Sequence, residues 1–187
     1  EWGVAGLAAL AAHAPNPAAL AEVTGLGPAV ATAVYDRVTM KLAAEPIEDL
    51  RIDFEDGYGP RPDDEEDTAA IRAAGALAAA RAERALPPFI GLRVKSLEPA
   101  TRRRGVRTLD LFLAALLADA PLPDGFVVTF PKVMAVEQVA ALVEICQRLE
   151  AAYRLPAGRL RFELQIETPQ SVLGAAVLVT VAQLVAE

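Results

Sequence analysis

Apolar and polar residues alternate along four short segments of the chain. In the first of them, Leu50, Ile52 and Phe54 alternate with charged residues. Alternation with a period of two places successive side chains on opposite faces of a β-strand. The pattern therefore predicts four strands, over residues 49–55, 89–95, 126–133 and 160–167.

The segments between these strands have a helical pattern, which predicts helices over about residues 63–85, 108–118 and 136–153. The apolar segment Val172–Val185 predicts one more helix. Strands that alternate with helices indicate an α/β fold with a parallel sheet. The acidic run Asp63–Asp67 is explained by the favourable position of acids at a helix N-terminus.

The chain before the first predicted strand has a different pattern. Residues 2–44 predict helices that are interrupted at Pro15–Pro17 and at Gly25–Pro28, where proline and glycine break the helical periodicity. We therefore predict an N-terminal helical segment over residues 1–44 and a βα domain over residues 45–187.

Charged residues lie on a single face of three of the predicted strands, at Arg51, Asp53 and Glu55, at Arg93 and Lys95, and at Arg161, Glu163 and Glu167. Both faces of a doubly wound sheet pack against helices, whereas one face of a βα barrel turns inward and can be polar near an active site. Opposite charges on such a face can pair, which offsets much of the penalty for burying them. We therefore predict a TIM-type (β/α)8 barrel. Because a complete barrel needs roughly 250 residues, we expect this chain to supply about the first four βα units.

Acids and bases occur together at the C-terminal ends of the predicted strands, at Glu55, Asp56, Arg93, Lys95, Lys132 and Glu167. Chemistry in βα barrels is located at these ends. Acids there could hold a hard cation such as Mg²⁺, which takes one or two protein carboxylates, and an arginine fork suits a planar carboxylate. The spacing of the acids in Asp53–Gly57 does not match a calcium loop.

The composition narrows the possible partners. A net charge of −7 argues against a general nucleic-acid surface, which has to be positive, and Arg102–Arg107 is a local basic exception. No apolar stretch predicts a membrane span, and no basic segment at the start predicts a secretory signal. A single cysteine, Cys146, excludes an internal disulfide and is expected to be a buried structural thiol. These features favour a cytoplasmic protein without nucleic-acid or membrane partners.

One short motif points to a different function. The sequence Gly25-Leu26-Gly27-Pro28 resembles the glycine hairpin of helix-hairpin-helix DNA-binding modules. A glycine-proline turn between two helices gives the same letters, and the acidic chain offers no supporting basic surface. His13, the only histidine, lies in the same helical region, where we expect a helix residue rather than a catalytic base.

Four motifs in order resemble the successive strand motifs of the HpcH/HpaI aldolase and citrate lyase beta-subunit superfamily, with a related motif in malate synthases. They are Ile52-Asp53-Phe54-Glu55-Asp56-Gly57, Gly91-Leu92-Arg93-Val94-Lys95, Thr129-Phe130-Pro131-Lys132-Val133 and Gln165-Ile166-Glu167-Thr168-Pro169. The resemblance runs from about Glu45 to Gly174. It implies a Mg²⁺-dependent or Mn²⁺-dependent enzyme, assembled as a homo-oligomer, that makes or breaks a carbon-carbon bond beside a 2-oxo acid or an acyl-CoA thioester.

The resemblance also implies roles for single residues. Glu167 would bind the metal, and Arg93 would bind a substrate carboxylate or enolate oxygen. Asp53 and Glu55 would orient Arg93 and metal-bound waters, while Lys132 and Lys95 would line the same pocket. The second metal ligand of the family is expected on a fifth strand, beyond Glu187. Arg102–Arg107 could meet CoA phosphates or lie in a solvated loop.

Two points leave the function open. No residue of the chain matches a catalytic base, so the base is either missing or supplied by a carboxylate or water. The alternative to an enzyme is a barrel scaffold without activity, in which the charged strand faces form internal salt-bridge layers.

Overall fold

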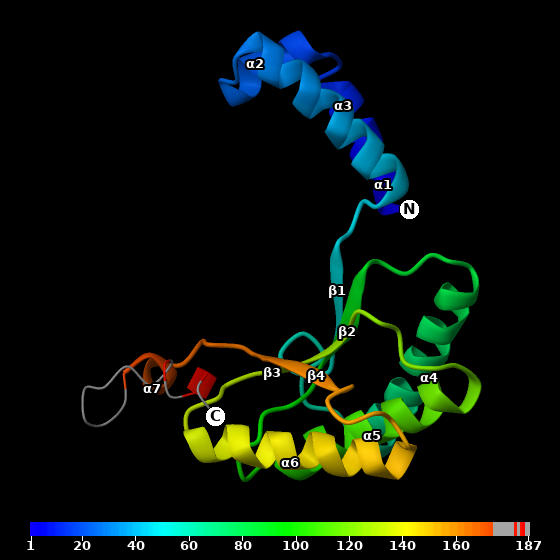
Figure 1. The fold of residues 1–187 in the computed structure, drawn as a ribbon, viewed down its shortest axis with the longest axis vertical. Coiled ribbons are helices and arrows are strands. Elements are labelled where there is room, and N and C mark those ends of the chain that lie inside the picture. The colour runs from blue at the N-terminus through cyan, green and yellow to red at the C-terminus, as the bar shows by residue number, and fades with distance from the viewer. Residues whose placement is uncertain (174–181, 183, 186–187) are drawn as a thin grey trace. The chain divides into compact units, whose positions relative to one another are not determined.

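The computed structural model describes residues 1–173, 182, 184 and 185, and the chain forms two compact units, Glu1–Asp49 and Leu50–Glu187 (Figure 1). The first unit contains helices α1 (Trp2–His13), α2 (Pro17–Thr24) and α3 (Pro28–Ala44). The breaks between them lie where proline and glycine predict them.

Local chemistry explains these breaks. The side chain of Asn16 accepts a hydrogen bond from the Ala19 amide at 3.0 Å and so caps the start of α2. Gly25 ends α2 with a φ angle of 72°, a left-handed conformation that favours glycine. His13 is exposed at the end of α1.

The second unit alternates strands and helices as the sequence predicts. Its elements are β1 (Asp49–Asp53), α4 (Asp63–Ala82), β2 (Phe89–Arg93), α5 (Arg102–Asp119), β3 (Phe126–Phe130), α6 (Val136–Tyr153), β4 (Arg161–Leu164) and the short α7 (Pro169–Val172). Each strand ends before the end of the range that alternation predicts. Asp53, Arg93, Thr129 and Glu163 therefore lie within strands, whereas Glu55, Lys132, Gln165 and Glu167 follow the strands in loops.

The sheet has the order β1-β2-β3-β4. Strands β2 and β3 pair in parallel, as do β3 and β4, and the register aligns Arg93 with Thr129 and Thr129 with Glu163. The predicted α/β class with a parallel sheet is confirmed.

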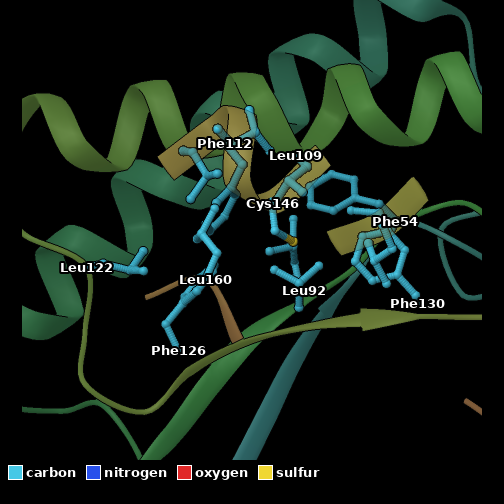
Figure 2. Packing of buried hydrophobic residues seen from close by; sticks show 14 of the residues in the cluster. Phe54, Leu92, Leu109, Phe112, Leu122, Phe126, Phe130, Cys146 and Leu160 are labelled. Atoms are coloured by element: carbon cyan, nitrogen blue, oxygen red, sulfur yellow. The ribbon is translucent and has the colours of Figure 1, made fainter. Parts of the chain in front are cut away.

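The apolar face of the sheet forms the core together with α4, α5 and α6 (Figure 2). Leu92, Phe126 and Phe130 from the strands belong to the same buried cluster as Phe112 of α5 and Cys146 of α6. Burial raises the pKa of the Cys146 thiol to about 11, which keeps it protonated and unreactive. The prediction of a buried structural thiol is confirmed.

The structure differs from the prediction at the start of α5, and it does not describe most of one predicted helix. Helix α5 begins at Arg102, so the solvated loop considered for Arg102–Arg107 is wrong. The ion pairs of Arg104 and Arg107 with Asp67 of α4 hold this basic turn in the helix. Most of the helix predicted over Val172–Val185 lies outside the described residues.

A helix that spans a membrane has to be both long and strongly apolar. Within residues 1–173, 182, 184 and 185, no single helix meets both requirements, and only the bent pair of α2 and α3 does so, by length and composition alone.

Candidate functional site

The polar face of the sheet surrounds a pocket of about 440 Å³. The polar residues that line it are Arg51, Asp53, Arg93, Thr129, Glu163 and Gln165. Because apolar strand residues pack on the opposite face, strand periodicity alone collects these groups on one side of the sheet. The sheet therefore has one apolar face and one charged face, as predicted.

A two-pronged ion pair between neighbouring strands is the strongest polar interaction in this pocket. Nε and Nη2 of Arg93 donate to the two carboxylate oxygens of Asp53 at 2.8 and 2.6 Å. The Asp53 carboxylate also accepts the amides of Glu55 and Gly57, at 2.9 and 2.8 Å. The Arg93 guanidinium, with these amides, lowers the pKa of Asp53 to about 2 although partial burial opposes this. Asp53 therefore stays ionised and fixes the plane of the guanidinium.

A second arginine lies in the same pocket. Nε of Arg51 donates to Glu163 and to the Thr129 hydroxyl, each at 3.1 Å, and Thr129 donates to Glu163 at 2.5 Å. Partial burial disfavours the Glu163 anion, but the hydrogen bonds from Thr129 and Arg51 outweigh it and lower the pKa of Glu163. Thr129 was missed at the sequence level because it is uncharged; the only signal was its place on the polar face of the third strand.

Lys132 joins three acids at the ends of the strands. Its ammonium contacts Glu55 and lies 2.8 Å from Asp56, and its backbone amide donates to Glu167 at 3.0 Å. Lys132 has a φ angle of 54°, a left-handed conformation that is unfavourable for a lysine and is found preferentially at functional sites. Hydrogen bonds from Asp56 and Glu55 raise the pKa of Lys132, so it stays a cation and cannot act as a free amine.

Gln165 connects the two groups of residues described above. Nη1 of Arg93 donates to the Gln165 amide oxygen at 3.1 Å, and the Gln165 amide nitrogen donates to Glu167 at 2.9 Å. The sequence placed Gln165 on the polar face but gave no reason to single it out. Of the predicted site residues, the structure thus brings together Asp53, Glu55, Arg93, Lys132 and Glu167.

Lys95 is the predicted site residue that lies elsewhere. Its ammonium donates to Glu66 of α4 at 2.6 Å and to the Phe54 carbonyl at 2.8 Å. These contacts join Lys95 to α4 and to the chain after β1, whereas Lys132 contacts both Glu55 and Glu167. Because β2 ends at Arg93, the alternation that placed Lys95 beside Arg93 does not continue to it.

The acidic start of α4 has more than the electrostatic role predicted for it. Glu66 is fully buried and contacts Lys95, Arg104 at 3.5 Å and the Thr108 hydroxyl at 2.6 Å. Asp67 pairs with Arg104 and Arg107. The explanation by helix N-terminal position alone is therefore wrong for these two residues, which hold α4 against α5 and β2.

The acids that remain for a metal ion are few. No group of three or more histidine, cysteine or acidic side chains with the spacing of a metal site occurs in the part of the chain that the structure describes. Glu55 and Asp56 are paired with Lys132, whereas Glu167 is exposed and, among the described residues, accepts hydrogen bonds only from the Lys132 amide and the Gln165 side chain. Since Mg²⁺ can be held by one protein carboxylate with water and substrate oxygens, Glu167 fits the smallest form of such a site.

A second concavity lies between α5 and α6, with a volume of about 840 Å³. Its apolar lining includes Leu97, Ile145 and Leu149, and its edge carries Arg102 and Arg103. These two arginines are exposed and have no ion-pair partner among the residues that the structure describes. We refer to this concavity as the α5/α6 groove.

Residues 1–187 match a family model described as Domain of unknown function (DUF6986). No curated protein and no solved structure matches the chain.

Proposed function

The chain belongs to the DUF6986 family, and we propose that its strand-end site is that of a metal-dependent carbon-carbon lyase acting on a 2-oxo acid or an acyl-CoA thioester. The observation that carries this proposal is the Arg93 guanidinium, held by Asp53 in a pocket at the C-terminal ends of parallel strands. Ligand sites of α/β folds are concentrated at these ends. The four motifs that resemble the HpcH/HpaI aldolase and citrate lyase beta-subunit superfamily support the same reaction, and with it a TIM-type barrel.

Each residue of the site has a different role in this proposal. Arg93 binds the substrate carboxylate, and Asp53 keeps the guanidinium oriented before the substrate arrives, which lowers the entropy lost on binding. The Lys132 ammonium remains protonated and contributes positive charge at the edge of the pocket. Glu167 would hold Mg²⁺, which would supply a Lewis acid that stabilises the negative charge developed as the carbon-carbon bond breaks.

Replacing Glu167 with alanine tests the metal site. We expect wild-type protein to bind Mn²⁺, a spectroscopic substitute for Mg²⁺, and to release pyruvate from 4-hydroxy-2-oxo acids or acetyl-CoA from acyl-CoA thioesters. Loss of this exposed carboxylate should weaken Mn²⁺ binding at least 10-fold and remove turnover. Electron paramagnetic resonance and a coupled product assay measure both quantities.

Glu144→Ala is the matched control, because Glu144 is an exposed acid of α6 whose ion pair with Arg148 lies on the surface. It should leave Mn²⁺ affinity and turnover unchanged. Equal Mn²⁺ affinity in wild-type protein and the Glu167→Ala variant would exclude Glu167 as the ligand.

A barrel scaffold without activity is the second candidate. It is favoured by the pairing of both pocket arginines, Arg93 with Asp53 and Arg51 with Glu163, which is what an internal salt-bridge layer requires. A scaffold would show no metal-dependent product release with any of these substrates, so the same assay separates the two candidates.

The α5/α6 groove favours the thioester among the two substrate classes. Leu97 follows β2 by four residues, so one end of the groove lies near the strand ends that carry Arg93. Two guanidinium groups that pair with no acid within the described part of the chain suit the phosphates of CoA, and the apolar lining suits its adenine or pantetheine part.

The variant Arg102→Ala/Arg103→Ala tests this assignment. Without both guanidinium groups, we expect the dissociation constant for CoA, measured by calorimetry, to rise about 10-fold or more. Arg148→Ala serves as the control, because Arg148 borders the same groove but is already paired with Glu144. If the double variant binds CoA as tightly as the wild-type protein, the α5/α6 groove is not part of the CoA-binding site.

A further inference from the structure

The Gln165 side chain lies between the two functional groups of the proposed site. We infer that Gln165 is a positioning residue that fixes the Arg93 guanidinium and the Glu167 carboxylate relative to each other, an inference that rests on the proposed function. Its amide accepts a hydrogen bond from Arg93 at 3.1 Å and donates one to Glu167 at 2.9 Å.

The polarity of the amide allows only one orientation here. The oxygen of Gln165 faces the Arg93 cation and its nitrogen faces the Glu167 anion. A flipped amide would place its nitrogen against the guanidinium and its oxygen against the carboxylate, and both contacts would be repulsive. Glutamine can therefore accept a hydrogen bond from Arg93 and donate one to Glu167. Glutamate could only accept from Arg93, and leucine could form neither hydrogen bond.

The other oxygen of Glu167 is held from a different element. The Lys132 amide donates to Oε1, while Gln165 donates to Oε2, so both oxygens of the carboxylate have a fixed donor. The left-handed backbone of Lys132 directs its amide to this position. Glu167 remains exposed, so the oriented carboxylate is still accessible from the solvent side. Groups that orient a metal ligand in this way typically change metal affinity 10–100-fold when they are removed.

A direct consequence is that the substrate-binding and cation-binding groups act as one unit. Asp53 holds two nitrogens of Arg93, and Gln165 holds the third. The Gln165 amide hydrogen-bonds to both groups, so the position of the guanidinium restricts the position of the Glu167 carboxylate. The carboxylate of a substrate on Arg93 and a cation on Glu167 would therefore meet at a separation that Gln165 sets.

Gln165→Leu tests the inference with two readouts, one of which needs no ligand. In the wild-type protein, NMR should show slow rotation about the Cζ–Nη1 bond of Arg93, because Nη1 is hydrogen-bonded to Gln165. In Gln165→Leu, this rotation should become fast, and Mn²⁺ affinity should fall 10–100-fold. In Gln165→Glu, which keeps an oxygen acceptor, the slow rotation should be restored.

Gln147→Leu is the matched control, since Gln147 is an exposed residue of α6. It should change neither readout, and the thermal unfolding midpoint of each variant shows whether it is folded. Slow Nη1 rotation in folded Gln165→Leu would overturn the inference, as would fast rotation combined with wild-type Mn²⁺ affinity. A wild-type protein that binds no Mn²⁺ would contradict the proposed function instead, and the Nη1 rotation alone would then decide the role of Gln165.

Discussion

Replacing Arg93 with methionine is expected to lower kcat/KM at least 100-fold for any substrate that the protein cleaves. The variant removes the guanidinium proposed to bind the substrate carboxylate, and a charge-assisted hydrogen bond contributes about 1.5–3 kcal/mol. Arg93→Lys retains the charge but not the fork that Asp53 orients, so it should recover only a small part of the activity. Steady-state kinetics of the two variants measure the effect.

The same variant should also change the pH dependence of stability. Because the pKa of Asp53 is lowered to about 2, its pairing stabilises the fold fully above the unfolded value near 3.8 and loses this effect as the pH falls toward 2. The shift corresponds to about 2 kcal/mol, since one pKa unit equals about 1.4 kcal/mol. Arg93 is the largest cause of this shift, but the Glu55 and Gly57 amides contribute to it and remain in the variant. Arg93→Met should therefore be less stable by part of this amount at pH 7, and its unfolding free energy should vary less between pH 5 and pH 2.

Urea unfolding at pH 7, 4 and 2.5 measures this difference. Arg148→Met is the control, because Arg148 is largely exposed and its ion pair with Glu144 lies on the surface. Retained activity in Arg93→Met would exclude Arg93 as the substrate-binding group. Equal pH profiles for wild-type protein and Arg93→Met would show that Asp53 does not depend on this arginine.

Most of the fold could be predicted because strand and helix periods are local properties of the sequence. The polar face of the sheet followed from alternation in β1, β2 and β4, and the meeting of Asp53 with Arg93 agrees with the adjacent places of their strands in the sheet. Thr129 and Gln165 could not be singled out, since neither is charged. Their roles depend on the register between strands, which a single sequence does not contain.

The direction of a side chain beyond the end of a strand could not be predicted from the sequence either. Lys95 was expected to share the face of Arg93, but the strand stops between them and the side chain turns to Glu66. The arginine-rich start of α5 lacks apolar periodicity, so its helix was predicted to begin too late. Ion pairs with α4, a contact across about 40 residues of sequence, hold Arg104 in the helix. Such pairings are tertiary, and a local pattern cannot reveal them.

Replacing Glu66 with glutamine is expected to lower the unfolding free energy by about 3 kcal/mol, a large part of the stability of an ordinary domain. Glu66 is the only acidic side chain among the described residues that is fully removed from solvent and has two cations against it. These cations, Lys95 and Arg104, are only 13% and 10% exposed. The amide keeps hydrogen-bond acceptors but no charge, so two poorly solvated cations would lie close together without compensation.

Glu65→Gln is the control for this variant, because Glu65 is its neighbour in α4, is 53% exposed and forms a surface ion pair with Arg61 at 3.6 Å. It should change the unfolding free energy by less than about 0.5 kcal/mol. Urea denaturation of both variants at pH 7 gives the comparison. A Glu66→Gln variant as stable as Glu65→Gln would mean that Lys95 and Arg104 reach water when the charge is removed. The buried carboxylate would then not be what holds α4, α5 and the end of β2 together, and Lys95 would be available to turn toward the strand-end pocket.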